Sequence, residues 1–169
     1  MSNPLPDQGL WDQFVEAKRQ MHHWQAEFYQ QTRDRQAVLR AALDPSAGVW
    51  QQGAAFDFLN SFTSEVIPLL PEVFRWAIKS ERWMVPAQEA IARIPRDERM
   101  TLLKPLFLDQ LETAEDDDYP NLARLAVRCE AWPLLDRLVQ QAASNDNPEV
   151  RELVEYYNDT YRPMWQSGR

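Results

Sequence analysis

Apolar residues recur along the first thirty positions of the chain at the spacing of a helix seam. The intervals between them are 4, 3, 4, 3 and 4 residues, and charged and amide residues fill most of the positions between. The seam consists of Leu10, Phe14, Ala17, Met21, Trp24 and Phe28. This spacing predicts a long amphipathic helix, preceded by a disordered tail over residues 1–9. A second helical stretch is expected over 37–43, before the breaker residues Asp44, Pro45 and Gly48.

The rest of the chain has the pattern of further helices. One is expected over 54–69, where Phe58, Leu59, Phe62 and Val66 share a face. Six shorter helices are expected near 71–81, 84–94, 97–111, 120–131, 133–143 and 148–161. No segment alternates apolar and polar residues at a period of two, so no sheet is expected and the fold class is all-α.

Two pairs of these helices have the pattern of an internal repeat. When Pro71–Trp83 is aligned on Pro120–Trp132, an offset of 49 residues, five of 13 positions are identical. In each copy a proline opens the first helix, and a tryptophan lies at the corner before the second helix. The apolar face of the second helix is expected to hold Ala87, Ala90, Ile91 and Ile94 in one copy, and Leu135, Leu138, Val139 and Ala142 in the other. Because one helical hairpin cannot bury its own apolar face, neighbouring hairpins are expected to stack.

The last helix begins with the motif Asp-Asn-Pro-Glu-Val-Arg at positions 146–151, followed by Leu153 and Val154. This start resembles the inner helix of HEAT-like repeats, and residues 66–159 are similar to small bacterial HEAT-like proteins of the polymorphic-toxin immunity type. The resemblance implies stacked antiparallel helical hairpins, a HEAT-like α-solenoid, that bind another protein. Residues 10–165 are expected to form one all-helical domain, with N-terminal helices over 10–69 and a repeat pair over 70–165, followed by a tail over 166–169.

Charge and cysteine content narrow the class of protein. The chain has 26 acidic and 18 basic residues, a net charge of −8, which fits poorly with binding nucleic acid phosphates. The N-terminus has neither the basic start nor the apolar run of a signal peptide. The most apolar stretch of the whole chain, residues 66–74, is interrupted by two prolines and is too short to span a bilayer. Cys129 is the single cysteine, so no intramolecular disulfide forms. A cytoplasmic protein that binds no membrane is expected.

Few residues in the sequence suggest catalysis. The glycines are isolated, so phosphate-binding loops are absent, and there are no paired cysteines for zinc. His23 and Glu27, four residues apart, form either a metal-binding face or a solvated helix face. Cys129 is either a nucleophile or a small core residue, and its apolar neighbours and its repeat partner Ser80 favour the core. The chain is expected not to be an enzyme and to hold neither a metal nor a cofactor.

Two groups of residues are candidates for binding a partner. The first is an acidic run between the repeat copies, which is either a solvated loop or a landing site for a basic partner. The second is a C-terminal aromatic group, which either packs back on the last hairpin or contacts a partner. The candidate residues are Glu112, Glu115, Asp116, Asp117, Asp118, Tyr157, Tyr161 and Trp165.

The resemblance to toxin immunity proteins, with the net charge of −8 and the lack of catalytic motifs, implies a protein that neutralises a bacterial toxin by covering its active site with an acidic helical surface. The expected partner is a basic toxin domain. One alternative is a structural module that joins the subunits of a larger assembly. A third possibility is an enzyme or small-molecule binder that uses a pocket between helices.

Overall fold

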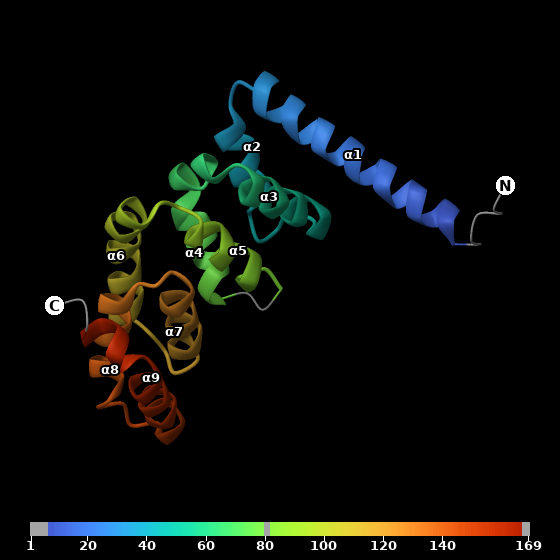
Figure 1. Ribbon diagram of the computed structural model, residues 1–169. Coiled ribbons are helices and arrows are strands. Elements are labelled where there is room, and N and C mark those ends of the chain that lie inside the picture. Colours follow the sequence, from blue (N-terminus) through green and yellow to red (C-terminus); the bar gives the residue numbers. More distant parts are fainter. Residues whose placement is uncertain (1–6, 80–81, 167–169) are drawn as a thin grey trace. The chain divides into compact units, whose positions relative to one another are not determined.

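The computed structural model describes residues 7–79 and 82–166, and over these residues the chain is helical and contains no strand (Figure 1). The prediction of an all-α chain is therefore confirmed. The helices are α1 (Gln8–Gln31), α2 (Arg35–Ala42), α3 (Val49–Ser61), α4 (Leu70–Lys79), α5 (Met84–Ala92), α6 (Arg96–Glu112), α7 (Asp118–Arg128), α8 (Trp132–Ala142) and α9 (Pro148–Gln166). Most of the two expected tails, positions 1–6 and 167–169, and the repeat position Ser80 lie outside the described residues.

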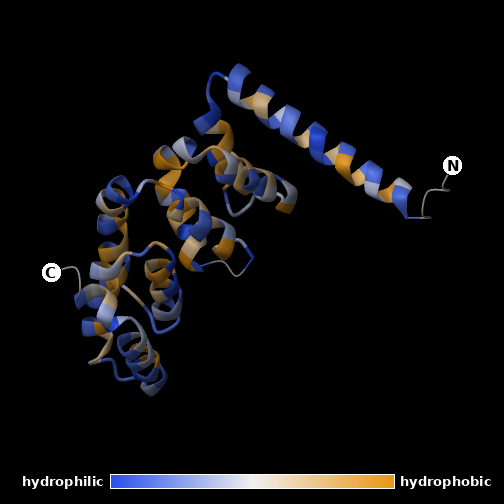
Figure 2. Cartoon of the chain, viewed as in Figure 1, coloured by the Kyte–Doolittle hydropathy of each residue, from blue (hydrophilic) through white to orange (hydrophobic). Residues whose placement is uncertain are grey.

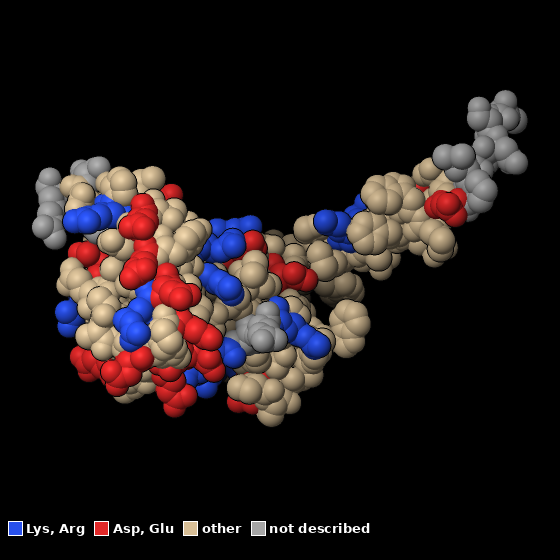
Figure 3. Space-filling model, turned by 90° about the horizontal axis from the view of Figure 1, so that it is seen from below, with Lys and Arg blue, Asp and Glu red and all other residues tan. Residues whose placement is uncertain are grey.

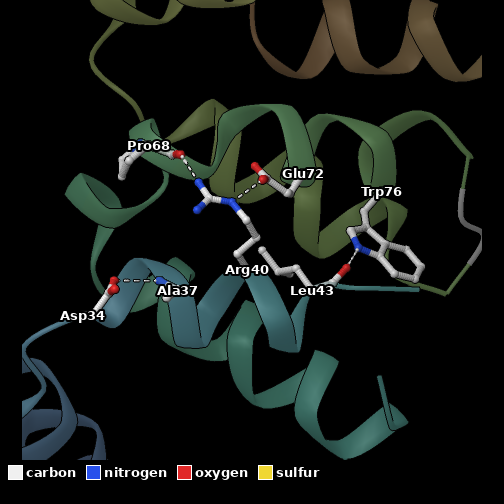
Figure 4. A network of polar contacts seen from close by, with 7 residues as sticks. All are labelled: Asp34, Ala37, Arg40, Leu43, Pro68, Glu72 and Trp76. Atoms are coloured by element: carbon white, nitrogen blue, oxygen red, sulfur yellow. Dashed lines mark hydrogen bonds and ion pairs between the residues drawn. The ribbon is translucent and has the colours of Figure 1, made fainter. Parts of the chain in front are cut away.

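The chain divides into two compact units, which we call unit 1 (Met1–Leu39) and unit 2 (Arg40–Arg169). The division falls within α2, whereas the sequence predicts one domain over residues 10–165 with an internal boundary after residue 69. Local hydrogen bonding organises the end of unit 1. Thr32 takes an extended conformation that ends α1, and the Asp34 carboxylate accepts a hydrogen bond from the Ala37 amide in the first turn of α2 (Figure 4).

The predicted long helix is present as α1, and its apolar seam lies at the surface. No residue of α1 is buried, and four large apolar side chains are more than half exposed. These are Leu10 (68%), Trp11 (58%), Phe14 (58%) and Trp24 (66%). Figure 2 shows hydrophobic positions recurring along the whole length of this helix. Within unit 1, the apolar seam of α1 thus includes the exposed side chains of Leu10, Phe14 and Trp24.

Unit 2 is built from helical hairpins with a continuous apolar core. Helix α4 packs against α5, α7 packs against α8, and α8 packs against α9, while α4 also lies against α7. Four core positions were predicted in the second helix of each repeat copy, and all eight are buried. Core side chains without solvent exposure include Leu59, Val73, Ala77, Leu103, Phe107, Leu122, Leu125 and Leu135.

The two tryptophans of the repeat occupy matching positions. Trp83 directly precedes α5 and stacks on Phe56 of α3, with ring centroids 5.7 Å apart. Trp132 begins α8 and stacks on Tyr161 of α9, with centroids 5.8 Å apart. Each indole therefore fills the corner at the start of the second helix, as expected, and joins its hairpin to a neighbouring helix.

The expected single helix over 54–69 is interrupted in the structure. Helix α3 begins earlier, at Val49, and ends at Ser61, and two short 3₁₀ helices, Thr63–Glu65 and Ile67–Leu69, connect it to α4. Proline has no amide hydrogen, and its ring clashes with the carbonyl four residues before it, so Pro68 disfavours an α-helix across this segment. A new helix, α4, starts two residues later and accommodates Pro71 in its first turn.

Side chains from other helices bind the carbonyl groups at most helix C-termini of unit 2. Trp76 Nε1 donates to the Leu43 carbonyl after α2 at 2.8 Å (Figure 4). In the same way Asn121 binds Ile78 at the end of α4, and Gln141 binds Leu111 at the end of α6. The last carbonyls of a helix have no partner within it, and these bonds satisfy them while linking one helix to another.

Arg99 is a buried charged residue among these linking side chains, with 7% of its surface exposed. From α6 its guanidinium donates to Ile94 O after α5 at 2.9 Å, to Cys129 O after α7 at 2.8 Å, and to Ala92 O. A positive charge is favourable at the negative ends of helix dipoles. Arg99 therefore stabilises the junction of α5, α6 and α7 by both charge and hydrogen bonding.

The Arg99→Met variant is expected to lose about 2–4 kcal/mol of unfolding free energy, because buried carbonyls lose a charged donor. Urea denaturation followed by circular dichroism measures this change. Arg96→Met in the first turn of the same helix is the matched control, since Arg96 is exposed, and it should change stability by less than about 0.5 kcal/mol. Equal effects of the two substitutions would contradict the linking role.

Candidate functional site

A groove with a volume of about 600 Å³ opens on unit 2 where α5, α7 and α9 meet. One wall is aromatic, because Tyr157 and Tyr161 from α9 are one helical turn apart and stack with ring centroids 5.8 Å apart. Tyr156 meets Tyr157 edge to face at 5.4 Å. With Trp132 stacked on Tyr161, four rings form a continuous row. The structure thus places the predicted Tyr157 and Tyr161 together in one concave site.

The tyrosines differ in how far they remain open to a partner. Tyr157 is 8% exposed and belongs to the core, whereas Tyr156 is 60% exposed at the rim of the groove. Burial raises the pKa of the Tyr157 phenol, while the charge and hydrogen bond of Arg124 act in the opposite direction. The phenol is therefore protonated at neutral pH and can donate a hydrogen bond.

The facing wall of the groove is cationic. Arg124 and Arg128 lie four residues apart on α7, so they project from the same side of the helix, and Val127 also lines the groove. Arg128 Nη1 lies 3.4 Å from Glu89 Oε1, and both side chains are more than 40% exposed. An ion pair this open to water is weak and can exchange for another anion. Neither arginine was predicted from the sequence as a binding residue, although both are basic residues within a strongly acidic segment.

The acidic run lies at the other end of α7 from these arginines, and its members have different environments. Glu112, Glu115 and Asp117 are exposed. Asp116 accepts hydrogen bonds from the side chains of Asn145 and Asn147, at 3.2 and 2.8 Å. Asp118 is 8% exposed and accepts from Gln110 Nε2 and from the Glu115 amide. Two of the five candidate carboxylates thus hold local structure, and three project into solvent.

The acidic run belongs to a longer segment that is rich in acidic residues. Residues 109–159 contain 13 acidic and four basic residues, a net charge of −9, whereas the rest of the chain has 13 acidic and 14 basic residues. On α9, Glu152, Glu155 and Asp159 are exposed on the face opposite the buried Val150, Val154 and Tyr157. Figure 3 shows Asp and Glu side chains gathered in a band across one face of unit 2. In the sequence, the acidic face of α9 is visible as Glu152, Glu155 and Asp159 at spacings of three and four residues.

The remaining candidate residues lie on α1 or outside the residues that the structure describes. His23 is exposed on α1 beside Trp24, with ring centroids 5.3 Å apart, and the Glu27 carboxylate accepts a hydrogen bond from Gln31. Within the described parts of the chain, no three His, Cys, Asp or Glu side chains are grouped to hold a metal ion. The backbone of Trp165 belongs to α9, but its side chain lies outside the described residues.

Cys129 is fully buried next to the groove arginines. Burial raises the pKa of its thiol to about 12, although the charges of Arg99 and Arg128 act in the opposite direction. The thiolate is the reactive form of cysteine, so this environment agrees with the core position that the repeat favoured.

No helix within residues 7–79 and 82–166 combines the length and the apolar character needed to cross a membrane. Comparisons with protein-family models, curated proteins and solved structures found no match to this chain. What the chain does is therefore inferred from its own surface and its groove.

Cys129 should resist thiol reagents in the folded protein. At pH 8 a thiol pKa of about 12 lowers the thiolate fraction about 1,000-fold relative to an ordinary cysteine. Labelling with Ellman's reagent should be slow in buffer and rapid in concentrated urea, with Cys129→Ala as the blank. Rapid labelling of the folded chain would contradict the burial of this side chain.

The tyrosines of the groove should separate into core and rim residues. Tyr157→Ala should cost about 3 kcal/mol of stability, because it leaves a cavity beneath α9. Tyr156→Ala should cost less than about 1 kcal/mol, because Tyr156 is mostly exposed. Urea titration of both variants measures the difference, and similar losses would overturn this assignment.

Proposed function

We propose that this chain is a protein-binding protein whose acidic surface on α6–α9 covers a basic surface of its partner. The observation that carries the proposal is the concentration of charge: residues 109–159 have a net charge of −9, and their exposed carboxylates lie on the outer face of α9 and at the α6–α7 connection. A surface of one sign accelerates encounter with a partner of the opposite sign and excludes partners of the same sign.

In this proposal the partner is a basic toxin domain, and the chain acts in the bacterial cytoplasm as an immunity protein that blocks the toxin by covering its active site. It acts by binding and carries out no catalytic reaction. The hairpins α4/α5 and α7/α8 serve as consecutive HEAT-like repeats, a proposal supported by their matching prolines and tryptophans and by the packing of α4 on α7. Stacked helical hairpins suit this role because they present an extended binding surface.

A second candidate function is that of a structural module in a larger assembly. It is favoured by the apolar seam of α1, where Trp11, Phe14 and Trp24 are more than half exposed. An exposed apolar seam favours contact with another surface. A chain with one acidic surface and one apolar helix has two different surfaces with which to join subunits.

The test is purification of the tagged chain from its own host at low salt, with identification of co-purifying proteins by mass spectrometry. The triple variant Glu152→Gln, Glu155→Gln, Asp159→Asn removes three carboxylates from α9. We expect this variant to recover a basic partner at least about tenfold less well, and raised salt to release the partner from the unmodified chain.

The matched control is Asp7→Asn, Asp12→Asn, Asp57→Asn, which removes three exposed carboxylates outside residues 109–159 and should leave recovery unchanged. Equal recovery with both triple variants would contradict binding through the acidic surface. Expression of the partner alone then separates the two functions. A toxic partner that becomes harmless on co-expression supports immunity, and a harmless subunit of a stable complex supports the structural module.

A further inference from the structure

We propose that the groove between α5, α7 and α9 binds an aromatic side chain and a neighbouring Asp or Glu carboxylate from a segment of a protein partner. The proposal rests on the proposed function only in taking the ligand from a protein. It adds a second contact, of opposite charge, to the acidic surface.

The carboxylate is assigned from the two arginines. Arg124 and Arg128 project from one side of α7 along the same wall of the groove. Guanidinium groups bind carboxylates through paired, charge-assisted hydrogen bonds. The Glu89 carboxylate already pairs with Arg128 at 3.4 Å. A partner carboxylate would therefore replace or join a weak, solvent-exposed pair instead of opening a buried one.

The aromatic ring is assigned from the opposite wall. The row formed by Trp132, Tyr161, Tyr157 and Tyr156 ends at the rim with Tyr156, which is 60% exposed. Aromatic rings stack or meet edge to face in such rows and gain energy beyond the area that they bury. The next ring of the row would belong to the partner, beside the apolar side chains of Met84 and Val85.

The surrounding charge favours a carboxylate over a phosphate group. Glu89 lies beside Arg128, and residues 109–159 have a net charge of −9. A phosphate monoester carries up to two charges at neutral pH, so it is repelled more strongly here than a carboxylate is. Two arginines within an acidic surface thus select a single negative charge.

The exposure of the rim favours a protein segment over a free small molecule. Pockets for small molecules enclose most of the ligand surface, whereas Val85 is 42% exposed, Tyr156 is 60% exposed and both arginines are exposed. A side-chain pair presented from the surface of a partner needs only this open form. Aromatic residues held in such positions are typical energetic centres of protein interfaces.

The experiment uses two dipeptides that differ in one group, N-acetyl-Trp-Asp-amide and N-acetyl-Trp-Asn-amide. Each is titrated to about 10 mM into the ¹⁵N-labelled full chain, and the backbone and arginine side-chain NMR signals are followed. We expect the Trp-Asp peptide to bind with a Kd of about 1 mM, a strength ordinary for so small a ligand. The shifts should centre on α7 and α9, and the Trp-Asn peptide should bind at least about tenfold more weakly.

Arg124→Gln and Arg128→Gln should each weaken the Trp-Asp peptide about fivefold or more. The matched control is Arg137→Gln, because Arg137 is exposed on α8 and does not line the groove. Three results would overturn the proposal: no shifts with either peptide, equal binding of the two peptides, or an equal loss with Arg137→Gln. Tighter binding of indole-3-acetate than of the dipeptide would overturn the assignment to a protein segment.

This outcome is separate from that of the acidic surface. The α9 variant with Glu152, Glu155 and Asp159 neutralised retains the groove side chains, so it should bind the Trp-Asp peptide at least as well as the unmodified chain does. If the dipeptide does not bind but the partner is recovered normally, only the groove proposal is rejected. Binding of the dipeptide with no partner dependent on α9 would reject the acidic surface alone.

Discussion

The last carbonyl groups of each helix need hydrogen-bond donors from outside that helix, and the packing of unit 2 depends on supplying them. With only four glycines, the chain rarely has the residue that most often completes a helix C-terminus. Side chains from elsewhere take this role instead, and the Arg99 guanidinium joins the ends of α5 and α7 to α6. Each of these bonds satisfies a polar group and also fixes one helix against another. The hairpins are therefore held by polar links at their ends as well as by the apolar core between them.

The same packing creates both an acidic outer face and a cationic, aromatic groove, and the functional proposals rest on these two surfaces. Burying Val150, Val154 and Tyr157 turns the acidic side of α9 outward. It also places the tyrosines of α9 opposite the arginines of α7, so that a cationic, aromatic groove lies within a strongly acidic part of the chain. An acidic surface sets the rate and selectivity of encounter, and a small groove with rings and guanidinium groups can provide the specific anchor. One helix, α9, contributes to both.

Several features follow from local patterns in the sequence and agree with the structure. The period of the apolar residues predicted the helices, and the 49-residue repeat predicted the buried faces of α5 and α8 and the corner positions of Trp83 and Trp132. The interruption after α3 was missed because Phe62 and Val66 continue an apolar face, although Pro68 disfavours a continuous helix there. The structural roles of Asp116 and Asp118 could not be predicted from the acidic run. Asp116 binds asparagines about 30 positions away, and nothing in the sequence distinguishes Gln110 as the partner of Asp118.

The sequence by itself determined the all-helical class, the boundaries of most helices and the acidic character of the last third of the chain. These depend on interactions between residues a few positions apart or on composition alone. Only the tertiary structure decided that Arg124 and Arg128 face Tyr157 and Tyr161, and that Arg99 joins three helices. Both arrangements bring together residues about 30 positions apart, and an isolated arginine on a helix carries no sign of the carbonyl, carboxylate or ring that packing places beside it.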